Sequence, residues 1–565
     1  MSVLESTLLI AAALAIFIPF FWRLFQGLPR WVDFVPAALL ALMLVQILVD
    51  GFQMYMIVVY ILVVVLFLQT VQRMIRPGAP GKASRWRTVL ALVGSLLGVV
   101  GLVVGIWAGP MMASGAGVDL SRESWTQAFE RMNGILAQRY AFSEWKEMDW
   151  DALHAEFAPR IAAAEEANDE EEYHMALREY VYSIPDGHIK FSGDDMSLWR
   201  ESIGGGYGLA VIELDDGSVI AHVVSEGGPV EVAGMTWGAE ILEWDGVPAR
   251  EALGQVAPIW LGLPPATEEG RRVTQQQLLT RAPAGTEVSI TFQNHGEEEA
   301  QTATLTAIDD GLEPLYESLG WGGSEKLKLG MGEEVGDDTI MRPPEYRILP
   351  EGYGYLRVYH MIPEDADPDF VEIVEKAVTE FVAQDVLGVL IDVRSNPGGH
   401  DTLVAQMMGY FASEPSFYEY MYLDNWLTGL SILDSAIPVE IEPKEPRYGG
   451  PVAVLIDENT LSSGEGFPMV AKRLPQGRVV GIHGTYGSFG MCCSNISLPG
   501  GFAVQYPPGQ SQDGDHRVQL DSDHTLQGGV VPDVRVPLTR DTVRAMYLDG
   551  EDVVLRYAME ALREE

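Results

Sequence analysis

The chain has 565 residues and a formal net charge of −43, with 80 acidic against 37 basic side chains. This length exceeds what one hydrophobic core usually organises, so we expect several globular units. Nucleic-acid binding is excluded as a main function, because a phosphate backbone needs a Lys/Arg-rich surface that this composition does not supply. The two cysteines, Cys492 and Cys493, are neighbours in sequence. They therefore provide neither a disulfide framework between distant segments nor a four-thiolate zinc site.

The first 114 residues are far more apolar than the rest. Apolar runs lie at about 6–27, 32–49, 53–71 and 88–112, each close to the roughly 20 residues that span a bilayer. Basic residues gather in the first and third connections: Arg23, Arg30, Arg73, Arg76, Lys82, Arg85 and Arg87. Since basic loops stay cytoplasmic, we expect residues 1–114 to form a permanent four-helix transmembrane anchor. The predicted localisation is multi-pass in a membrane and in contact with lipid. The portion after about residue 114 would then be extracytoplasmic, in the periplasm or at the cell exterior.

Residues 119–200 are predicted to form a small helical subdomain, because Trp125, Phe129 and Met132 recur at helical spacing. The helical pattern ends at Ser183-Ile-Pro-Asp-Gly-His188. Pro and Gly break a helix there and leave His188 in a turn with its ring free to project. A lone histidine is more often structural than catalytic, so its role depends on context.

Residues 201–311 alternate apolar and polar positions in short stretches, which predicts a β-rich domain. The stretch from Gly206 to Val211, followed by glycine-bounded segments at 228–234 and 238–246, resembles a PDZ domain of the protease-associated kind. The resemblance implies capture of an extended chain end by strand addition. The amides that would bind its terminal carboxylate belong to Gly206, Tyr207, Gly208, Leu209 and Ala210. The alternative is a β-rich spacer whose groove is closed.

A linker at 312–350 is expected to precede an α/β core at 351–545, with a final helix at 546–565. The continuous apolar run Val386 to Val393 predicts a strand in a sheet covered on both faces. This run leads into Asp392-Val-Arg-Ser-Asn-Pro-Gly-Gly399. Glycines at a strand end allow backbone N–H groups to approach a developing anion closely.

A second apolar run, Val452 to Ile456, precedes Asp457-Glu-Asn-Thr-Leu-Ser-Ser-Gly-Glu465 and a helix from about residue 466. Ser462 or Ser463 therefore lies at a strand-to-helix turn, where the positive helix end favours an oxyanion. A hydroxyl residue at a helix start is otherwise a plain cap.

The ordered motifs Asp-Gly-His, PDZ-like, Asp-Val-Arg-x-Asn-Pro-Gly-Gly, Ser-x-Gly-Glu and Gly-Val-Val-Pro-Asp resemble the C-terminal processing (tail-specific) and tricorn-core serine peptidases over about residues 120–545. The resemblance implies a core of the ClpP/crotonase-like type and Ser462 as nucleophile. It implies an oxyanion site made by the amides of Ser463 and of Gly398 or Gly399. It implies neither a metal nor an organic cofactor.

The general base follows from the same resemblance. Processing peptidases use a lysine after a Thr-Phe-Gly-type turn, but the matching stretch Gly484-Thr-Tyr-Gly-Ser488 ends in serine. In the tricorn branch the base is a histidine before the PDZ-like region, which implies His188. The carboxylate that would orient His188 stays open between Asp521 and Asp523, and either is equally well read as a solvated loop acid.

The sequence thus predicts a multidomain, membrane-anchored serine endopeptidase. It would cleave extracytoplasmic proteins or peptides through an acyl-enzyme, with a PDZ-like module that binds substrate chain ends. The alternative is a catalytically inactive, PDZ-containing scaffold that only binds peptides. The sequence leaves open whether the chain forms a homo-oligomer.

Overall fold

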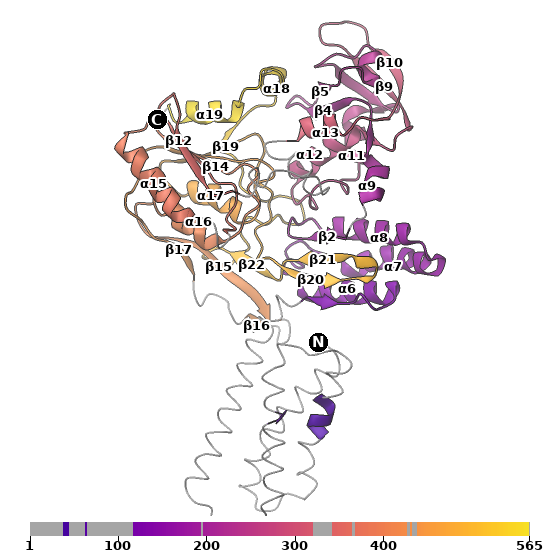
Figure 1. The fold of residues 1–565 in the computed structure, drawn as a ribbon, viewed down its shortest axis with the longest axis horizontal. Coiled ribbons are helices and arrows are strands. Elements are labelled where there is room, and N and C mark those ends of the chain that lie inside the picture. The colour runs from indigo at the N-terminus through magenta and orange to yellow at the C-terminus, as the bar shows by residue number, and fades with distance from the viewer. Residues whose placement is uncertain are drawn as a thin grey trace, which may run out of the picture. The chain divides into compact units, whose positions relative to one another are not determined.

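The computed structural model describes residues 38–43, 63–64, 117–193, 196–319, 342–363, 368–425, 430–431 and 438–563 (Figure 1). The chain divides into two compact units, Met1–Gly117 with Leu423–Ile432, and Val118–Tyr422 with Leu433–Glu565. In the first unit, strand β16 (Leu430–Ser431) pairs antiparallel with the end of β15 (Ser416–Asn425). All candidate site residues belong to the second unit.

The expected transmembrane anchor is corrected by the structure. No helix within the described ranges is long and apolar enough to cross a bilayer. A span needs about 20 continuous helical residues, whereas the helical pieces described between residues 1 and 114 cover only 38–43 and 63–64. The rest of the four expected spans lies outside the described residues. Four predictions are therefore wrong: the fold class with a four-helix anchor, the lipid partner, the multi-pass localisation and the extracytoplasmic placement.

A six-stranded sheet forms the core of the second unit, in the order β12-β13-β14-β18-β19-β23. Its first pair is antiparallel and the other four pairs are parallel. The strands are β12 (Glu345–Ile348), β13 (Gly354–Arg357), β14 (Val389–Asp392), β18 (Val452–Leu455), β19 (Gly477–Gly481) and β23 (Val534–Arg535).

Both faces of this sheet are covered, and its central strands are buried: all four residues of β18 are apolar, as are the first three of β14. Val389 and Ile391 pack into one hydrophobic cluster with the helices α15 (Phe370–Ala383), α16 (Asp401–Met408) and α17 (Ser463–Ala471). Leu390 points to the other face, against α19 (Val553–Ala561). Figure 1 shows α15, α16 and α17 along one side of the strands.

A buried charge network fixes the loop that leaves β14. The Asp392 carboxylate accepts hydrogen bonds from Tyr355 Oη at 2.7 Å and Arg394 Nη2 at 2.7 Å, and it also pairs with Arg357. Arg394 Nη2 lies 2.7 Å from Asp552 Oδ2 as well, at the start of α19. Burial raises the pKa of Asp392, but Arg394 and Arg357 outweigh that effect and hold it well below the ordinary value.

We expect Asp392→Asn to lower the free energy of unfolding by about 3–5 kcal/mol, because it leaves two buried guanidinium groups without their shared charge. The folded-state pKa of Asp392 is depressed, so its contribution is present above the ordinary carboxyl pKa and is lost as pH falls. Urea unfolding of both proteins from neutral to acid pH measures this. Glu414→Gln, which changes an exposed acid, is the control. Equal midpoints for Asp392→Asn and wild type would contradict the network's role.

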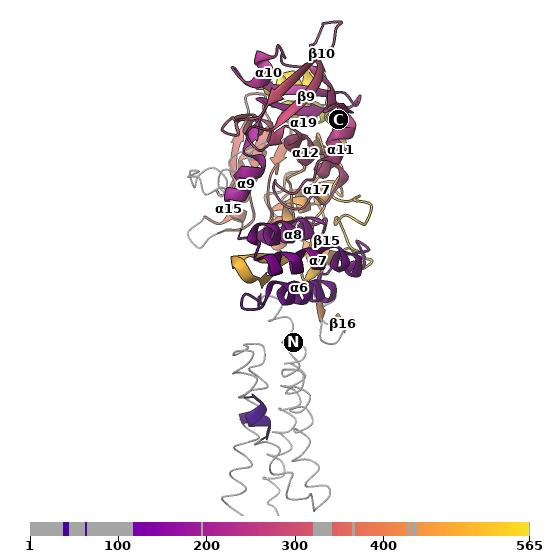
Figure 2. The same cartoon turned by 90° about the vertical axis from the view of Figure 1, so that its right-hand side faces the viewer.

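A helical layer packs against a small sheet built from distant segments. Helices α6 (Trp125–Arg139), α7 (Trp150–Ala167) and α8 (Glu170–Tyr182) share one hydrophobic core with β20 (Ser494–Ser497) and β21 (Ala503–Tyr506). These strands lie between β1 (Val118–Asp119) and β2 (Lys190–Ser192) in the order β1-β20-β21-β2. Figure 2 shows the three helices stacked together. Because β2 follows the turn after α8 and pairs with β21, this turn is held next to the β20–β21 segment.

The segment 204–310 forms an antiparallel sheet in the order β10-β9-β6-β5-β4, with β7 beside β6. Its strands are β4 (Leu209–Glu213), β5 (Val219–Val224), β6 (Glu240–Trp244), β7 (Val247–Pro248), β9 (Glu287–Gln293) and β10 (Gln301–Thr306). A smaller sheet joins β11 (Ile308–Asp309), β3 (Gly205–Gly206) and β8 (Arg281–Ala282).

The remaining elements cover these sheets. Around the antiparallel sheet lie α9 (Met196–Ile203), α10 (Pro229–Val232), α11 (Ala249–Gln255), α12 (Glu268–Leu279) and α13 (Glu313–Ser318). Strands β17 (Val439–Ile441) and β22 (Gly509–Gln512) pair with β15, and α18 (Arg540–Tyr547) precedes α19.

Candidate active site

Ser462 occupies the sharp turn between β18 and α17. Its φ of 55° and ψ of −135° lie outside the regions that non-glycine residues ordinarily adopt, and such strain is typical of a nucleophile held at a strand-to-helix turn. The Ser462 amide donates to the Ser488 carbonyl at 3.0 Å, and the Ser462 carbonyl accepts from Glu465 at 2.8 Å. The side chain is half-buried. The turn therefore presents a constrained hydroxyl at the N-terminus of α17.

The glycine loop after β14 lies directly against this turn. A Cβ on Gly398 would be 2.6 Å from Ser462 Cβ, and Gly398 has a φ of +96°, so only glycine fits. The Gly398 N–H already donates to Asn396 Oδ1 at 2.9 Å. In the described part of the chain, the Gly399 and Ser463 amides have no acceptor, and the Ser463 hydroxyl donates to the Gly399 carbonyl at 3.0 Å. Of the two glycines, Gly399 is the one whose N–H is available.

His188 follows the last turn of α8. The Gly187 N–H donates to Ser488 Oγ at 2.8 Å, while the Ser488 carbonyl accepts from Ser462. One residue thus joins the histidine turn to the serine turn. Gly187 packs so tightly that an added Cβ would lie 2.6 Å from the Tyr486 ring. The His188 ring is buried, and neither ring nitrogen has a hydrogen-bond partner within the described residues.

Asp186 is the carboxylate beside His188. Its Oδ1 lies 3.6 Å from His188 Nδ1 and accepts the His188 amide at 2.8 Å, while Oδ2 accepts from Tyr140 Oη at 2.8 Å. Burial raises the pKa of Asp186, but the interaction with His188 and the charge of Lys146 lower it below the ordinary value. Asp186 is therefore ionised at neutral pH.

The pKa of His188 is set by opposing effects. Burial lowers it, but Asp186, Asp521 and Glu465 raise it above the ordinary value. A carboxylate placed next to an imidazole favours the protonated ring, as required of a base that must accept a proton.

Asp521 and Lys146 complete this buried cluster. Lys146 Nζ lies 4.0 Å from Asp521 Oδ1, and both side chains are fully buried. Lys146 also donates to the Ser522 carbonyl at 2.7 Å and hydroxyl at 2.9 Å. Burial and the charge of Asp186 raise the pKa of Asp521 well above its ordinary value, although Lys146 and His188 oppose this. The pKa of Asp521 therefore lies above that of Asp186, so of the two carboxyl groups Asp521 is the one that holds a proton more readily.

Glu465 holds the loop at 484–488, which ends in Ser488. Its carboxylate accepts from the Gly487 amide at 2.9 Å and the Ser488 amide at 3.0 Å, and also from the Thr485 hydroxyl. Burial raises the pKa of Glu465 to about 7, against these hydrogen bonds. Ser488 is therefore fixed from both sides and acts as a spacer between the serine and histidine turns.

Six of the seven catalytic residues predicted from the sequence lie near one another, and Asp523 lies apart. Ser462, Ser463, Gly398 and Gly399 lie on the two adjoining loops, and His188 with Asp521 belongs to the buried cluster beside them. Asp523 is partly exposed and caps its own turn through the Thr525 amide at 2.8 Å and hydroxyl. These Thr525 hydrogen bonds lower the pKa of Asp523, and Asp523 is not among the main charges that shift the pKa of His188.

Sequence reasoning missed Asp186 and Lys146. Asp186 stands two residues before His188, and that spacing was the available signal. Lys146 carried no signal, because a lone lysine between helices is ordinarily solvated.

The predicted carboxylate-binding loop, Gly206 to Ala210, is buried throughout. Gly206 is paired in β3, and a Cβ there would lie 2.3 Å from Arg281 Nη1, which forms a buried ion pair with Asp310 at 2.8 Å. Capture of a chain end by Gly206, Tyr207, Gly208, Leu209 and Ala210 stays a prediction, and it requires this loop to open.

The described residues contain no group of three or more His, Cys, Asp or Glu side chains placed to hold a metal ion. The chemistry that the site itself offers is nucleophilic. It comprises a constrained serine hydroxyl, a histidine with a charged carboxylate, and two available amides, that of Ser463 at the N-terminus of α17 and that of Gly399 on the adjoining loop.

Comparisons with known proteins bear on the family and the fold. The model of peptidase family S41 matches residues 352–536, and that of the tricorn protease C1 domain matches residues 121–180. The structure of mature CPAF complexed with lactacystin is 14% identical, with a TM-score of 0.51 over 78% of this chain and 99% of that chain. Mature CPAF is 15% identical, with a TM-score of 0.51 over 78% and 97%. At such identity the likeness shows the fold alone. A search of curated proteins finds no match.

Proposed function

Because this chain is a serine-type peptidase with a family S41 domain, we propose that it hydrolyses peptide bonds through an acyl-enzyme on Ser462, with His188 as the general base. His188 accepts the Ser462 proton as Oγ attacks the substrate carbonyl. The Ser463 and Gly399 amides stabilise the resulting oxyanion, and His188 returns the proton to the leaving amine. Water then releases the acyl group by the same steps.

The observation that carries this proposal is the double use of Ser488. Its carbonyl accepts the Ser462 amide and its hydroxyl accepts the Gly187 amide, at 3.0 and 2.8 Å. Two turns separated by 274 residues are thereby held next to each other. A base must lie within hydrogen-bond reach of its nucleophile, and in free enzymes that bond is often formed only when substrate closes the site.

Cleavage of an unfolded protein tests the proposal. We expect the full-length protein to convert casein to fragments, and we expect a fluorophosphonate to abolish this activity in proportion to its incorporation. If folded protein neither cleaves casein nor incorporates the reagent, the hydrolytic proposal fails and the peptide-binding scaffold takes its place.

We expect Asp186→Asn to lower kcat/KM by about 10²–10⁴, because the neutral amide no longer stabilises the imidazolium or fixes its tautomer. The pH profile gives a second readout. In wild type, activity rises as His188 loses its proton, at a pH above the ordinary value. In Asp186→Asn the carboxylate charge that raises the pKa of His188 is removed, while burial still lowers that pKa. The rise of activity on the acid side of the pH profile (the acid limb) therefore moves to lower pH.

The matched control is Asp523→Asn, which changes an acid outside the buried cluster and should alter kcat/KM by less than about twofold. An Asp186→Asn variant with an unmoved acid limb, or an Asp523→Asn variant with the larger loss, would contradict the assignment of Asp186.

A further inference from the structure

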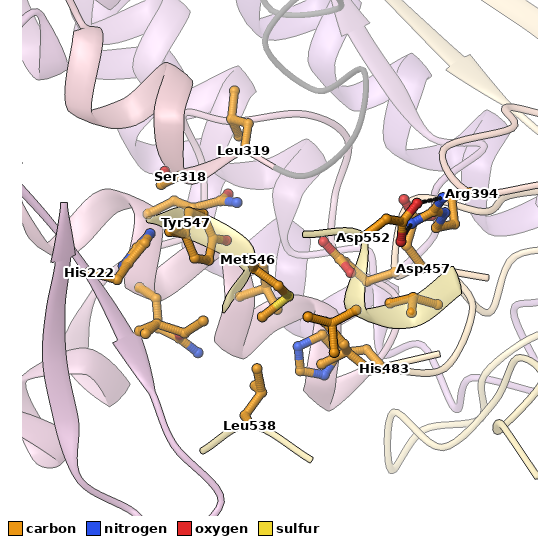
Figure 3. A pocket seen from close by; sticks show the side chains of 18 of the residues that line it. His222, Ser318, Leu319, Arg394, Asp457, His483, Leu538, Met546, Tyr547 and Asp552 are labelled. Carbon is orange, nitrogen blue, oxygen red and sulfur yellow. Dashed lines mark hydrogen bonds and ion pairs between the residues drawn. The ribbon is translucent and has the colours of Figure 1, made fainter. Parts of the chain in front are cut away.

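A cavity of about 660 Å³ lies between the antiparallel sheet and the parallel core. Its walls come from β4, β5 and α12, from the turn after β18, and from α18 and the start of α19 (Figure 3). None of the residues assigned above to proton transfer or oxyanion binding lines it. Its volume is that of a ligand site rather than a packing defect.

Polar groups without partners face this cavity. Within the described residues, neither ring nitrogen of His222 has a hydrogen-bond partner, and the same is true of His483 Nδ1. His222 is 3% exposed and its ring lies 4.5 Å from that of Tyr547. Burial lowers the pKa of His222 to about 3, so the ring is neutral and offers one donor and one acceptor. Buried polar groups left unpaired in this way point to a missing ligand or solvent.

An acidic pair forms one wall of the cavity. No cation pairs with Asp457 or Glu458 in the described part of the chain. The two arginines that line the cavity are already engaged, Arg394 with Asp552 at 2.7 Å and Arg342 with Glu345 at 3.7 Å. Burial and the charge of Asp457 raise the pKa of Glu458 to about 7. The pair therefore has an excess of negative charge that a cation would relieve.

Asp457 is the member of the acidic pair that is held in place by hydrogen bonds. Asp457 accepts hydrogen bonds from the Ser395 amide at 2.7 Å and hydroxyl at 2.8 Å, and from the Thr460 hydroxyl at 3.0 Å. These partners belong to the loops that carry the oxyanion glycines and Ser462. A carboxylate fixed before binding loses little conformational entropy when a ligand arrives.

Apolar side chains also line the cavity, among them Ile212, Leu538 and Met546. A lysine or arginine side chain matches this combination, because its methylene stem packs on apolar surface while its charged head reaches an acidic group. Such a side chain would arrive as part of a polypeptide, since the substrate of a peptidase is a polypeptide.

We propose that this cavity is a second polypeptide-binding site, which takes a lysine or arginine side chain of a bound chain with its charged head at Asp457 and Glu458. The site is separate from the place of bond cleavage and selects basic segments. Binding in this cavity does not depend on Ser462 acting as the nucleophile. The inference can therefore fail while the proposed function holds, and the proposed function can fail while the inference holds.

Calorimetric titration of the full-length Ser462→Ala variant tests the inference without cleavage. The probes are acetyl-Ala-Ala-Lys-Ala-Ala-amide and its norleucine analogue, which keeps the stem and lacks the charge. We expect the lysine peptide to bind at least about tenfold more tightly. Near pH 7 its binding should also release a proton, because the incoming cation favours the ionised form of Glu458. Titration in buffers of different ionisation enthalpy measures that proton.

A second substitution localises the effect. Glu458→Gln should remove both the preference for lysine and the proton release, and it should fold, because neutral Glu458 is already populated near pH 7. Glu440→Gln, which changes an exposed acid on β17 and makes the same change in net charge, should leave both unchanged. Equal binding of the two peptides, binding of neither, or an unaltered preference in Glu458→Gln would overturn the proposal.

Discussion

Ser462→Ala is expected to lower kcat/KM for peptide hydrolysis by about 10⁵–10⁶, the scale seen when a serine peptidase loses its nucleophile. The hydroxyl is the only part removed. The strained turn, the α17 N-terminus and the backbone amides remain, so substrate binding should be little changed. Initial rates with an internally quenched peptide measure the loss.

Ser463→Ala is the matched control for this substitution. Its hydroxyl donates to the Gly399 carbonyl at 3.0 Å, whereas the proposed catalytic contribution of Ser463 is its backbone amide, which alanine retains. Loss of one such hydrogen bond should cost about tenfold or less. If Ser463→Ala were the inactive variant and Ser462→Ala remained active, the nucleophile would have been assigned to the wrong serine.

His188→Ala is expected to reduce kcat/KM by about 10⁴–10⁶, because a serine hydroxyl is a weak nucleophile without a base and nucleophile and base act as one unit. The buried ring is 5% exposed and beside Asp186. Removing it therefore leaves a small space, and added imidazole should restore part of the activity. The restored rate should rise with pH as imidazole loses its proton.

His295→Ala controls for the loss of a histidine as such, since His295 is exposed between β9 and β10. It should retain full activity without imidazole. The double variant Ser462→Ala/His188→Ala should be no less active than Ser462→Ala alone. Full activity of His188→Ala would remove the base assignment, and additive losses in the double variant would show that the two residues act separately.

Local sequence patterns predicted the elements that carry the nucleophile. The apolar runs at 386–393 and 452–456 contain β14 and β18, because a strand covered on both faces is apolar at most of its positions. The strands are shorter than the runs. Val386 precedes β14 and its amide bonds to the Phe381 carbonyl at the end of α15. The apolar run thus continues into a turn where Val386 is buried but Leu387 is exposed.

Patterns of apolar residues failed where long-range pairing decides the structure. The expected helical subdomain gave no sign that β20 and β21, more than 300 residues later, would share its core. The same limit applied to Lys146, which is buried only because Ser522 and Asp521 meet it from the far end of the chain. The transmembrane anchor was wrong for another reason, since apolar composition alone does not establish a spanning helix.

Fluorophosphonate labelling, with identification of the modified residue by tandem mass spectrometry, decides whether Ser462 is the nucleophile activated by His188. We expect one adduct, on Ser462, in full-length wild-type protein near neutral pH, with slower labelling below the pKa of His188 and almost none in His188→Ala. An adduct on another serine, or undiminished labelling of Ser462 in His188→Ala, would contradict this assignment.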